Sequence, residues 1–232
     1  MKLISFRRFV IVCLSLFFIP FLVSAQTTIS ILGDSYSTFL GHVTPASNAI
    51  WYGEVNAGDN HSKNNVHQLE QTWWYLLINK MNAKLECNNS YSGSTICLSG
   101  YKDTDYSDRA FIARIHNLGN PDIIFIFGGT NDAWASSPIG NYQYEKWTRQ
   151  DLFYFRPAFA YLLNQLTMLY PKALICNISN CNISSAILES MQVICSHYGV
   201  KNIQLENIEK QSGHPSIDGM RAISDQVYNA VQ

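Results

Sequence analysis

The sequence has few charged residues, no internal repeat and no linker rich in proline, glycine and serine. Charged residues make up 14% of the 232 positions, and the formal net charge at pH 7 is −1. Without a basic stripe the chain offers little to a nucleic acid or to an anionic membrane surface, and we expect neither partner. The hydrophobic content of 47% and the missing linker indicate one folded α/β domain with a sizeable core.

Complete metal-binding motifs are also missing. The three cysteines and one histidine between residues 176 and 197 do not have the spacing of a structural zinc site. The three aspartates between residues 103 and 108 do not complete a calcium-binding loop. We therefore expect no metal and no cofactor.

The first 25 residues have the pattern of a targeting segment. Positive charges at the start precede the apolar run Phe9–Val23, and the small residues Ser24 and Ala25 precede Gln26. This pattern is typical of a secretory signal peptide at residues 1–25, followed by a domain at residues 26–232. The run is short for a membrane span, so we expect a secreted or periplasmic protein with no stable membrane insertion after cleavage. A retained anchor is the alternative.

Five cysteines follow the targeting segment. Cys87 and Cys97 flank a polar loop and can form a disulfide in an oxidising compartment. The other three fall in or beside predicted strands and helices, where buried free thiols are common. Because five is an odd number, at least one thiol stays free or pairs with another chain.

Short apolar runs alternate with segments whose apolar residues recur at helical spacing. This alternation predicts right-handed crossovers and a parallel sheet with helices on both faces. The expected strands are residues 29–32, 83–87, 122–127, 173–178 and 200–205, and the expected helices are residues 66–82, 107–118, 157–169, 187–198 and 220–231.

Small and polar residues follow three of these strands: Gly33-Asp34-Ser35, Tyr91-Ser92-Gly93-Ser94 and Gly129-Thr130-Asn131-Asp132. His214 lies in a loop after the last strand. Serine hydrolysis needs a nucleophile, a base and donors aimed at the developing oxyanion. Ser35 can be the nucleophile and His214 the base. The backbone N–H groups of Ser35 and Gly93, with the side-chain amide of Asn131, can be the donors.

These four blocks, in this order, resemble the SGNH (GDSL-like) hydrolase family. The resemblance spans nearly the whole chain after residue 25. It implies a flavodoxin-like three-layer αβα sandwich with a five-stranded parallel sheet. It also implies ester hydrolysis through an acyl-serine, with Ser35, Gly93 and Asn131 forming the oxyanion hole. The chain has no Gly-x-Ser-x-Gly motif, so the nucleophile elbow of the α/β-hydrolases is the poorer match.

The chain departs from the family at the position three residues before the histidine. The family usually has Asp there, and this chain has Gln211. The side-chain oxygen of Gln211 or a backbone carbonyl can orient His214 without supplying a charge. Glu209 or Asp218 can supply a displaced acid, although neither has the expected spacing.

Two further acids support the predicted site. We expect Asp34 to accept hydrogen bonds from the backbone of its own turn. We expect Asp132 to contact the first block or to cap the segment that follows it.

Aromatic residues gather in two long connections, residues 38–65 with Trp51-Tyr52 and residues 134–155. We interpret the first connection as a substrate-binding insertion beside Ser35. Aromatic rings favour an ester carried by a carbohydrate, such as an O-acetyl group, and they also suit an acyl chain. The leading hypothesis is a serine esterase with a small-molecule or glycan ester as substrate. The alternatives are an acyltransferase that uses the same site and a catalytically weak glycan-binding relative.

Overall fold

Five strands form one parallel sheet in the computed structural model, which describes residues 26–54 and 63–232. They are β1 (Thr28–Gly33), β2 (Lys84–Ser90), β3 (Ile123–Gly128), β4 (Leu174–Ser179) and β5 (Lys201–Gln204). Their order in the sheet is β2-β1-β3-β4-β5, and each neighbouring pair is parallel. This is the flavodoxin-like order, so the expected fold class is confirmed. The predicted signal peptide, residues 1–25, lies outside the described residues.

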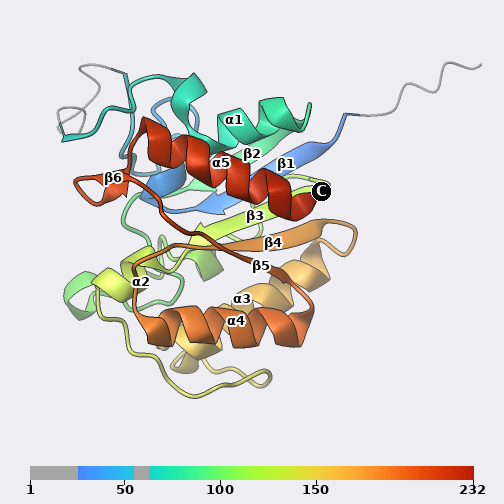
Figure 1. Ribbon diagram of the computed structural model, residues 1–232. Coiled ribbons are helices and arrows are strands. Elements are labelled where there is room, and N and C mark those ends of the chain that lie inside the picture. The colour runs from blue at the N-terminus through green and yellow to red at the C-terminus, as the bar shows by residue number, and fades with distance from the viewer. Residues whose placement is uncertain (1–25, 55–62) are drawn as a thin grey trace, which may run out of the picture.

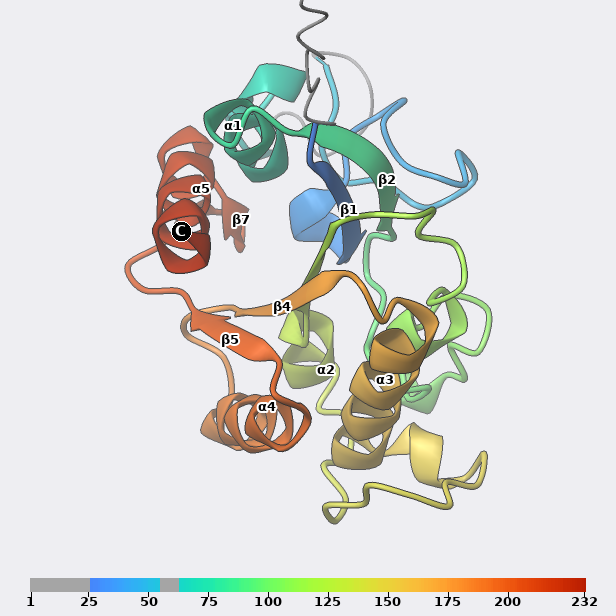
Figure 2. The same ribbon diagram turned by 90° about the vertical axis from the view of Figure 1, so that its right-hand side faces the viewer.

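Four long helices cover the two faces of the sheet (Figures 1 and 2). Helices α1 (Trp73–Lys80) and α5 (Ile217–Val231) pack together on one face, and α3 (Phe155–Leu169) and α4 (Ser185–Tyr198) pack together on the other. The shorter helices are η1 (Ser35–Ser37), η3 (Leu69–Gln71), η4 (Tyr101–Asp103), η5 (Phe111–Ala113), α2 (Thr130–Trp134) and η6 (Asp151–Phe153). None of the helices described has the length and apolar character needed to cross a membrane.

Strand β3 is the centre of the core, and all six of its residues are buried. Successive side chains of a strand point to opposite faces, so the apolar residues of β3 pack into the core on both faces of the sheet. Ile124 and Ile126 belong to the cluster under α3 and α4, whereas Phe125 and Phe127 belong to the cluster under α1 and α5. Trp73 meets both phenylalanine rings edge-on, at centroid distances of 6.2 and 5.7 Å. The expected buried central strand is therefore confirmed.

The predicted helix over residues 107–118 is wrong. Only the single 3-10 turn η5 forms there, although the apolar side chains of Phe111, Ile112 and Ile115 are buried as the pattern requires. Arg114 stands among them, and its guanidinium is also buried, where it donates to backbone carbonyl groups. The helical spacing of the apolar residues thus predicted correctly which side chains are buried, but it did not predict the conformation of the backbone. The predicted helix over residues 66–82 is likewise shorter, because α1 begins only at Trp73.

The suggested disulfide between Cys87 and Cys97 is also wrong, since all five cysteines of the described residues are free and buried. The Cys87 thiol points to the carbonyl oxygen of Asn117 at 3.2 Å, and the Cys97 thiol points to that of Ser99 at 3.5 Å. Each sulfur therefore has its own backbone partner. Burial raises the pKa of Cys87 to about 11 and that of Cys195 to about 12, which keeps both as unreactive thiols.

We predict that the chain beginning at Gln26 carries five free thiols. Unfolding it without a reductant in the presence of an alkylating reagent should add five labels, as counted by intact mass spectrometry. The native chain should label slowly, because buried thiols are neutral and shielded. Three or fewer labels on the unfolded, unreduced chain would show a disulfide and contradict this prediction.

Candidate active site

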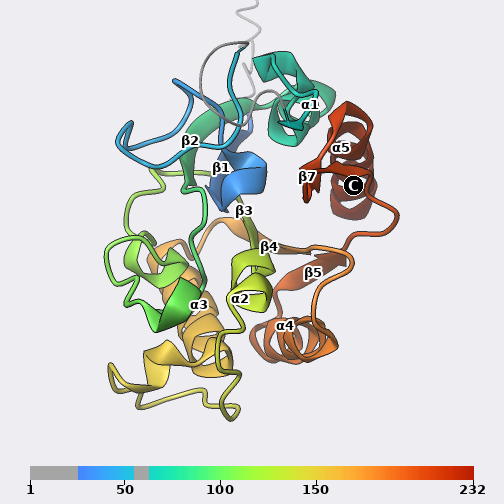
Figure 3. The same cartoon turned by 90° about the vertical axis from the view of Figure 1, so that its left-hand side faces the viewer.

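The polar blocks expected from the sequence meet at the carboxyl edge of the sheet (Figure 3). Helix η1 follows β1 directly, helix α2 follows β3, and a small two-stranded ladder, β6 (Lys210–Gln211) with β7 (His214–Pro215), lies beside them. Ligands of open parallel sheets bind outside the carboxyl ends of the strands, where the strand order reverses. Here the strand order reverses between β1 and β3, so the topology of the sheet predicts a ligand-binding site at this edge.

Ser35 and His214 are in direct contact. The hydroxyl oxygen of Ser35 lies 2.9 Å from Nε2 of His214, although the two residues are 179 positions apart in the chain. Both side chains are buried, with exposed fractions of 3% and 5%. The structure therefore brings the predicted nucleophile and base within proton-transfer distance.

A tight hairpin presents His214 to the serine. Gln211 pairs with His214 across the β6–β7 ladder, and Ser212 and Gly213 form the turn, with φ values of 50° and 78°. Positive φ at both central residues is typical of the type I′ hairpin turn. The carbonyl oxygen of Ser212 accepts from Nδ1 of His214 at 3.2 Å. This bond assigns the proton to Nδ1 and leaves Nε2 as the acceptor for the Ser35 hydroxyl.

The group that orients His214 is therefore a backbone carbonyl, which is one of the alternatives left open by the sequence. The Gln211 side chain does not take that place, and its contribution is backbone pairing in the ladder. The carboxylate of Asp218 is bound by Arg221 instead. In the part of the chain that the structure describes, no carboxylate contacts the imidazole of His214.

Three side chains hold the hairpin, and the sequence pointed to only one of them, Tyr52, as part of the predicted insertion. The Tyr36 hydroxyl donates to the carbonyl of Gly213 at 2.6 Å, and the Tyr52 hydroxyl donates to that of Pro215 at 2.9 Å. The Asn64 amide donates to the carbonyl of His214 at 3.2 Å. Tyr36 belongs to η1 and directly follows Ser35 in the chain. Its hydrogen bond to Gly213 therefore connects the turn that carries Ser35 to the hairpin that carries His214.

Aromatic rings surround the imidazole of His214. Trp51 stacks on it with a centroid distance of 3.5 Å and an angle of 6° between the planes. Tyr36, Tyr52 and Trp134 lie farther away, at centroid distances of 5.2, 6.1 and 5.9 Å. The connection predicted as a substrate-binding insertion thus reaches the site through Trp51 and Tyr52, while its residues 55–62 lie outside the described residues.

This enclosure lowers the pKa of His214 from 6.5 to about 4, mainly because burial removes water from the charged imidazolium. The carbonyl of Ser212 acts in the opposite direction, and the nearby cation of Lys210 adds to the lowering. His214 is therefore a neutral base at physiological pH.

The side-chain amide of Asn131 has one fixed orientation. Its oxygen accepts from the Tyr101 hydroxyl at 2.8 Å, and its nitrogen donates to the Asp34 carboxyl at 3.4 Å. Burial raises the pKa of Tyr101 to about 12, so its hydroxyl stays a donor. Gly93 has φ of 81°, which favours glycine, and open space faces the position where a Cβ would stand. No acceptor among the described residues takes the Gly93 N–H, which leaves that donor available to a ligand.

The two aspartates hold backbone segments. Asp34 accepts from the N–H of Tyr36 at 3.0 Å, within its own turn, and burial raises the pKa of Asp34 to about 7. Asp132 accepts from the N–H groups of Ile96 and Cys97 at 2.8 and 3.2 Å. It therefore binds the segment after the Gly93 block, rather than the first block or the segment that follows it. Burial raises the pKa of Asp132 to about 6.

Arg114 is a supporting residue that sequence reasoning missed. Its guanidinium donates to the carbonyl of Gly33 at 3.1 Å, to the Ser94 hydroxyl at 3.0 Å and to the carbonyl of Asn89. It thereby joins the ends of β1 and β2 to the Gly93 block. Burial lowers the pKa of Arg114 to about 9. A single arginine inside an apolar run was the signal in the sequence, but it does not identify the partner.

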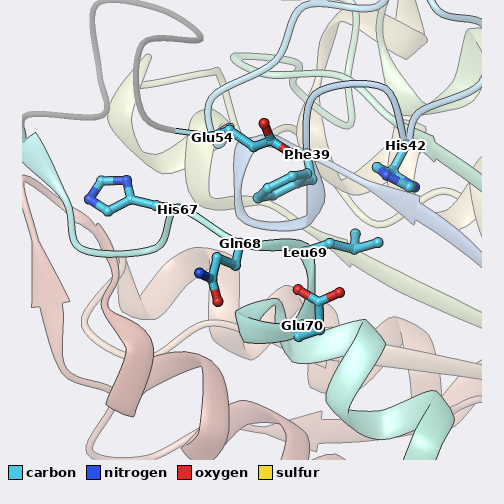
Figure 4. Close-up of a pocket in the computed structure, with 7 residues that line it drawn as sticks. All are labelled: Phe39, His42, Glu54, His67, Gln68, Leu69 and Glu70. Atoms are coloured by element: carbon cyan, nitrogen blue, oxygen red, sulfur yellow. The ribbon is translucent and has the colours of Figure 1, made fainter.

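A separate hollow of about 720 Å³ opens beside the connection between β1 and α1 (Figure 4). The residues that line it are Phe39, His42, Glu54, His67, Gln68, Leu69 and Glu70. Ser35 and His214 do not line this hollow, so it is distinct from the site described above.

Comparisons with known proteins agree with this architecture. The model of the GDSL-like lipase/acylhydrolase family matches residues 27–231. A GDSL-like lipase from Bacteroides uniformis is 56% identical, with a TM-score of 0.86 over 89% of this chain and 95% of that one. A second GDSL-like lipase, from Bacteroides ovatus, is 50% identical, with a TM-score of 0.85 over 88% and 97%. No curated protein matches the chain.

A more distant solved structure shares the fold alone. It is a family two carbohydrate esterase from Clostridium thermocellum in complex with cellohexaose. It is 13% identical, with a TM-score of 0.56 over 88% of this chain and 63% of that one.

We predict that the imidazole of His214 titrates with a pKa of about 4, far below its ordinary value of 6.5. Nuclear magnetic resonance of isotope-labelled histidine across a pH series measures it, and the spectrum of His214→Gln identifies the resonance. Lys210→Met should raise this pKa, because the substitution removes a neighbouring cation. A pKa at or above 6.5 in the unmodified protein would contradict the burial of a neutral imidazole.

Proposed function

Because this chain belongs to the GDSL-like lipase/acylhydrolase family, we propose that it hydrolyses a carboxylic ester through an acyl-serine intermediate. Ser35 is the nucleophile and His214 is its general base. The observation that carries the proposal is the 2.9 Å contact between the Ser35 hydroxyl and Nε2 of His214. The Ser212 carbonyl supports it by holding the imidazole in the tautomer that accepts a proton at Nε2.

Acylation begins when the Ser35 oxygen attacks the ester carbonyl and its proton passes to Nε2 of His214. The carbonyl oxygen becomes an oxyanion. The Asn131 amide and the Gly93 N–H are available to it, together with the N–H of Ser35. Such donors accelerate acyl transfer because they are already oriented when the charge develops. The Tyr101 hydroxyl contributes by fixing which end of the Asn131 amide faces the oxyanion.

Collapse of the tetrahedral intermediate expels the alcohol, which takes the proton from Nε2 of His214. Water then attacks the acyl-serine, again giving a proton to His214. The carboxylic acid leaves as Ser35 regains that proton, which restores the starting state. Every proton in this cycle moves through the single Nε2 atom of His214, so no second acid is needed.

For the substrate we propose an ester carried by a carbohydrate, such as an O-acetyl group. Trp134 is 45% exposed although it lies beside the imidazole of His214, so an apolar face is open to solvent next to the reacting atoms. Flat aromatic faces suit the apolar faces of sugar rings. The carbohydrate esterase from Clostridium thermocellum, which shares this fold over 63% of its chain, was solved in complex with cellohexaose, and this supports a carbohydrate as substrate.

We retain export as part of this proposal. The apolar run and small residues before Gln26 support a signal peptide. A glycan ester outside the cytoplasm is a substrate that such an exported hydrolase meets.

Replacing Ser35 with Ala should lower turnover of p-nitrophenyl acetate by at least about 1000-fold, because the acyl-serine can no longer form. Steady-state release of p-nitrophenol measures the loss. Ser196→Ala removes an exposed hydroxyl on α4 and should keep the original rate. Equal residual activity of the original protein and Ser35→Ala would refute the assignment.

Replacing Trp134 with Ala should lower kcat/KM for an acetylated oligosaccharide by about 10-fold, the size of one lost ring contact. The value for p-nitrophenyl acetate should change by less than about 3-fold, since that substrate has no sugar. The rate of acetate release from each substrate, measured under the same conditions for the original protein and for Trp134→Ala, gives the two changes in kcat/KM. The same loss for both would indicate general damage to the site and would contradict a sugar platform at Trp134.

A further inference from the structure

The proposed cycle places a positive charge on an imidazole that no carboxylate among the described residues contacts. His214 becomes an imidazolium in each half of the reaction, yet its side chain is only 5% exposed. Its Nδ1 partner is the neutral carbonyl of Ser212, and the cation of Lys210 lowers its pKa further, which disfavours a second positive charge. A buried cation without a partner is costly, so another group must stabilise this transient charge.

Trp51 has the geometry for that task. Its indole lies parallel to the imidazole, at 6° and 3.5 Å, so its face covers the ring that becomes charged. The rings of Tyr36, Trp134 and Tyr52 meet the imidazole at 58°, 62° and 78° and at longer distances. The face of an aromatic ring carries partial negative charge, and indole provides the strongest such face among the side chains.

The indole is also tethered to the turn that carries the nucleophile. The backbone N–H of Trp51 donates to the Thr38 hydroxyl at 2.9 Å, and that hydroxyl donates to the carbonyl of Ser35 at 3.0 Å. The position of Trp51 is thus set by the same turn that sets Ser35. The stack over His214 is a built part of the site rather than a chance contact of a surface ring.

An indole is retained here at a cost. Its Nε1–H is buried without an acceptor among the described residues, and an unpaired buried donor is unfavourable. A phenyl ring would fill the position without that cost. The choice of indole over phenyl at position 51 is explained if the site needs the more electron-rich face of the indole against His214.

We propose that Trp51 is a positioning residue that stabilises the imidazolium of His214, in the role that an acidic residue performs in Ser-His-Asp sites. The Ser212 carbonyl holds the imidazole in its plane through Nδ1, and the face of Trp51 prevents the ring from tilting while it favours the charged form. This inference rests on the proposed function and extends it by one residue.

Substituting fluorinated tryptophans at position 51 alone tests the inference, because fluorine weakens the negative face while the shape and the burial stay nearly unchanged. Through mono-, di- and trifluorotryptophan, kcat/KM for p-nitrophenyl acetate should fall in steps to about one tenth. That loss equals about 1.4 kcal/mol, within the range of a partly desolvated cation–π contact. The pKa of His214 should fall in parallel, and the pH profile of kcat/KM should shift with it.

The same analogues at Trp147 control for fluorine itself, since that indole packs edge-on against Tyr161 of α3 and donates to the carbonyl of Gln143. They should leave both readouts unchanged. A second comparison uses ordinary variants, in which Trp51→Phe should retain more activity than Trp51→Leu because the phenyl ring keeps part of the aromatic face.

Two failures are distinguishable. If the unmodified protein lacks turnover that depends on Ser35, the proposed function is wrong and this inference falls with it. If the unmodified protein turns over ester and all Trp51 analogues share its rate and its His214 pKa, the function stands and the role of Trp51 is overturned.

Discussion

The hydrogen bond between the Ser35 hydroxyl and Nε2 of His214 is the contact on which the candidate site depends. It joins the end of the first strand to a hairpin near the end of the chain. The sheet makes this possible by placing β1 beside β3, so that η1 stands at the reversal of strand order. The hydroxyl groups of Tyr36 and Tyr52 then fasten the hairpin at a distance that allows proton transfer.

Burial is the second common cause in this site. It raises the pKa of Asp34 and of Asp132, and it lowers the pKa of His214, so each of these groups is shifted toward its neutral form. Arg114 is a buried cation that joins the ends of β1 and β2 to the Gly93 block, and its donors are taken by carbonyl and hydroxyl oxygens. In the enclosed site that the described residues form, no carboxylate contacts the imidazole of His214, and a carbonyl dipole and aromatic rings surround it instead.

The sequence predicted the sheet and the four polar blocks because these are local features. A run such as Ile123–Phe127 can be buried on both faces only as a central strand, and it was found there. The prediction of a helix over residues 107–118 was wrong because helical spacing of apolar residues indicates which side chains are buried, not which backbone conformation buries them. Arg114 in this segment is not in a helix, and it donates to the carbonyl of Gly33 at the end of β1. The disulfide suggested for Cys87 and Cys97 failed because spacing along the chain does not determine where two thiols point.

By itself the sequence determined the order of the five strands, four of the five expected helices, the family, and the residue types that meet at the carboxyl edge. These follow from periodicity and from motifs a few residues long. Only the tertiary structure decided that the Ser212 carbonyl orients His214, that Trp51 covers its face and that Tyr101 fixes Asn131. The physical reason is that each role is defined by distance and angle across the fold, and most of these partners lie far apart in the chain. Even the nearest partner, Ser212, acts through a carbonyl that every residue possesses.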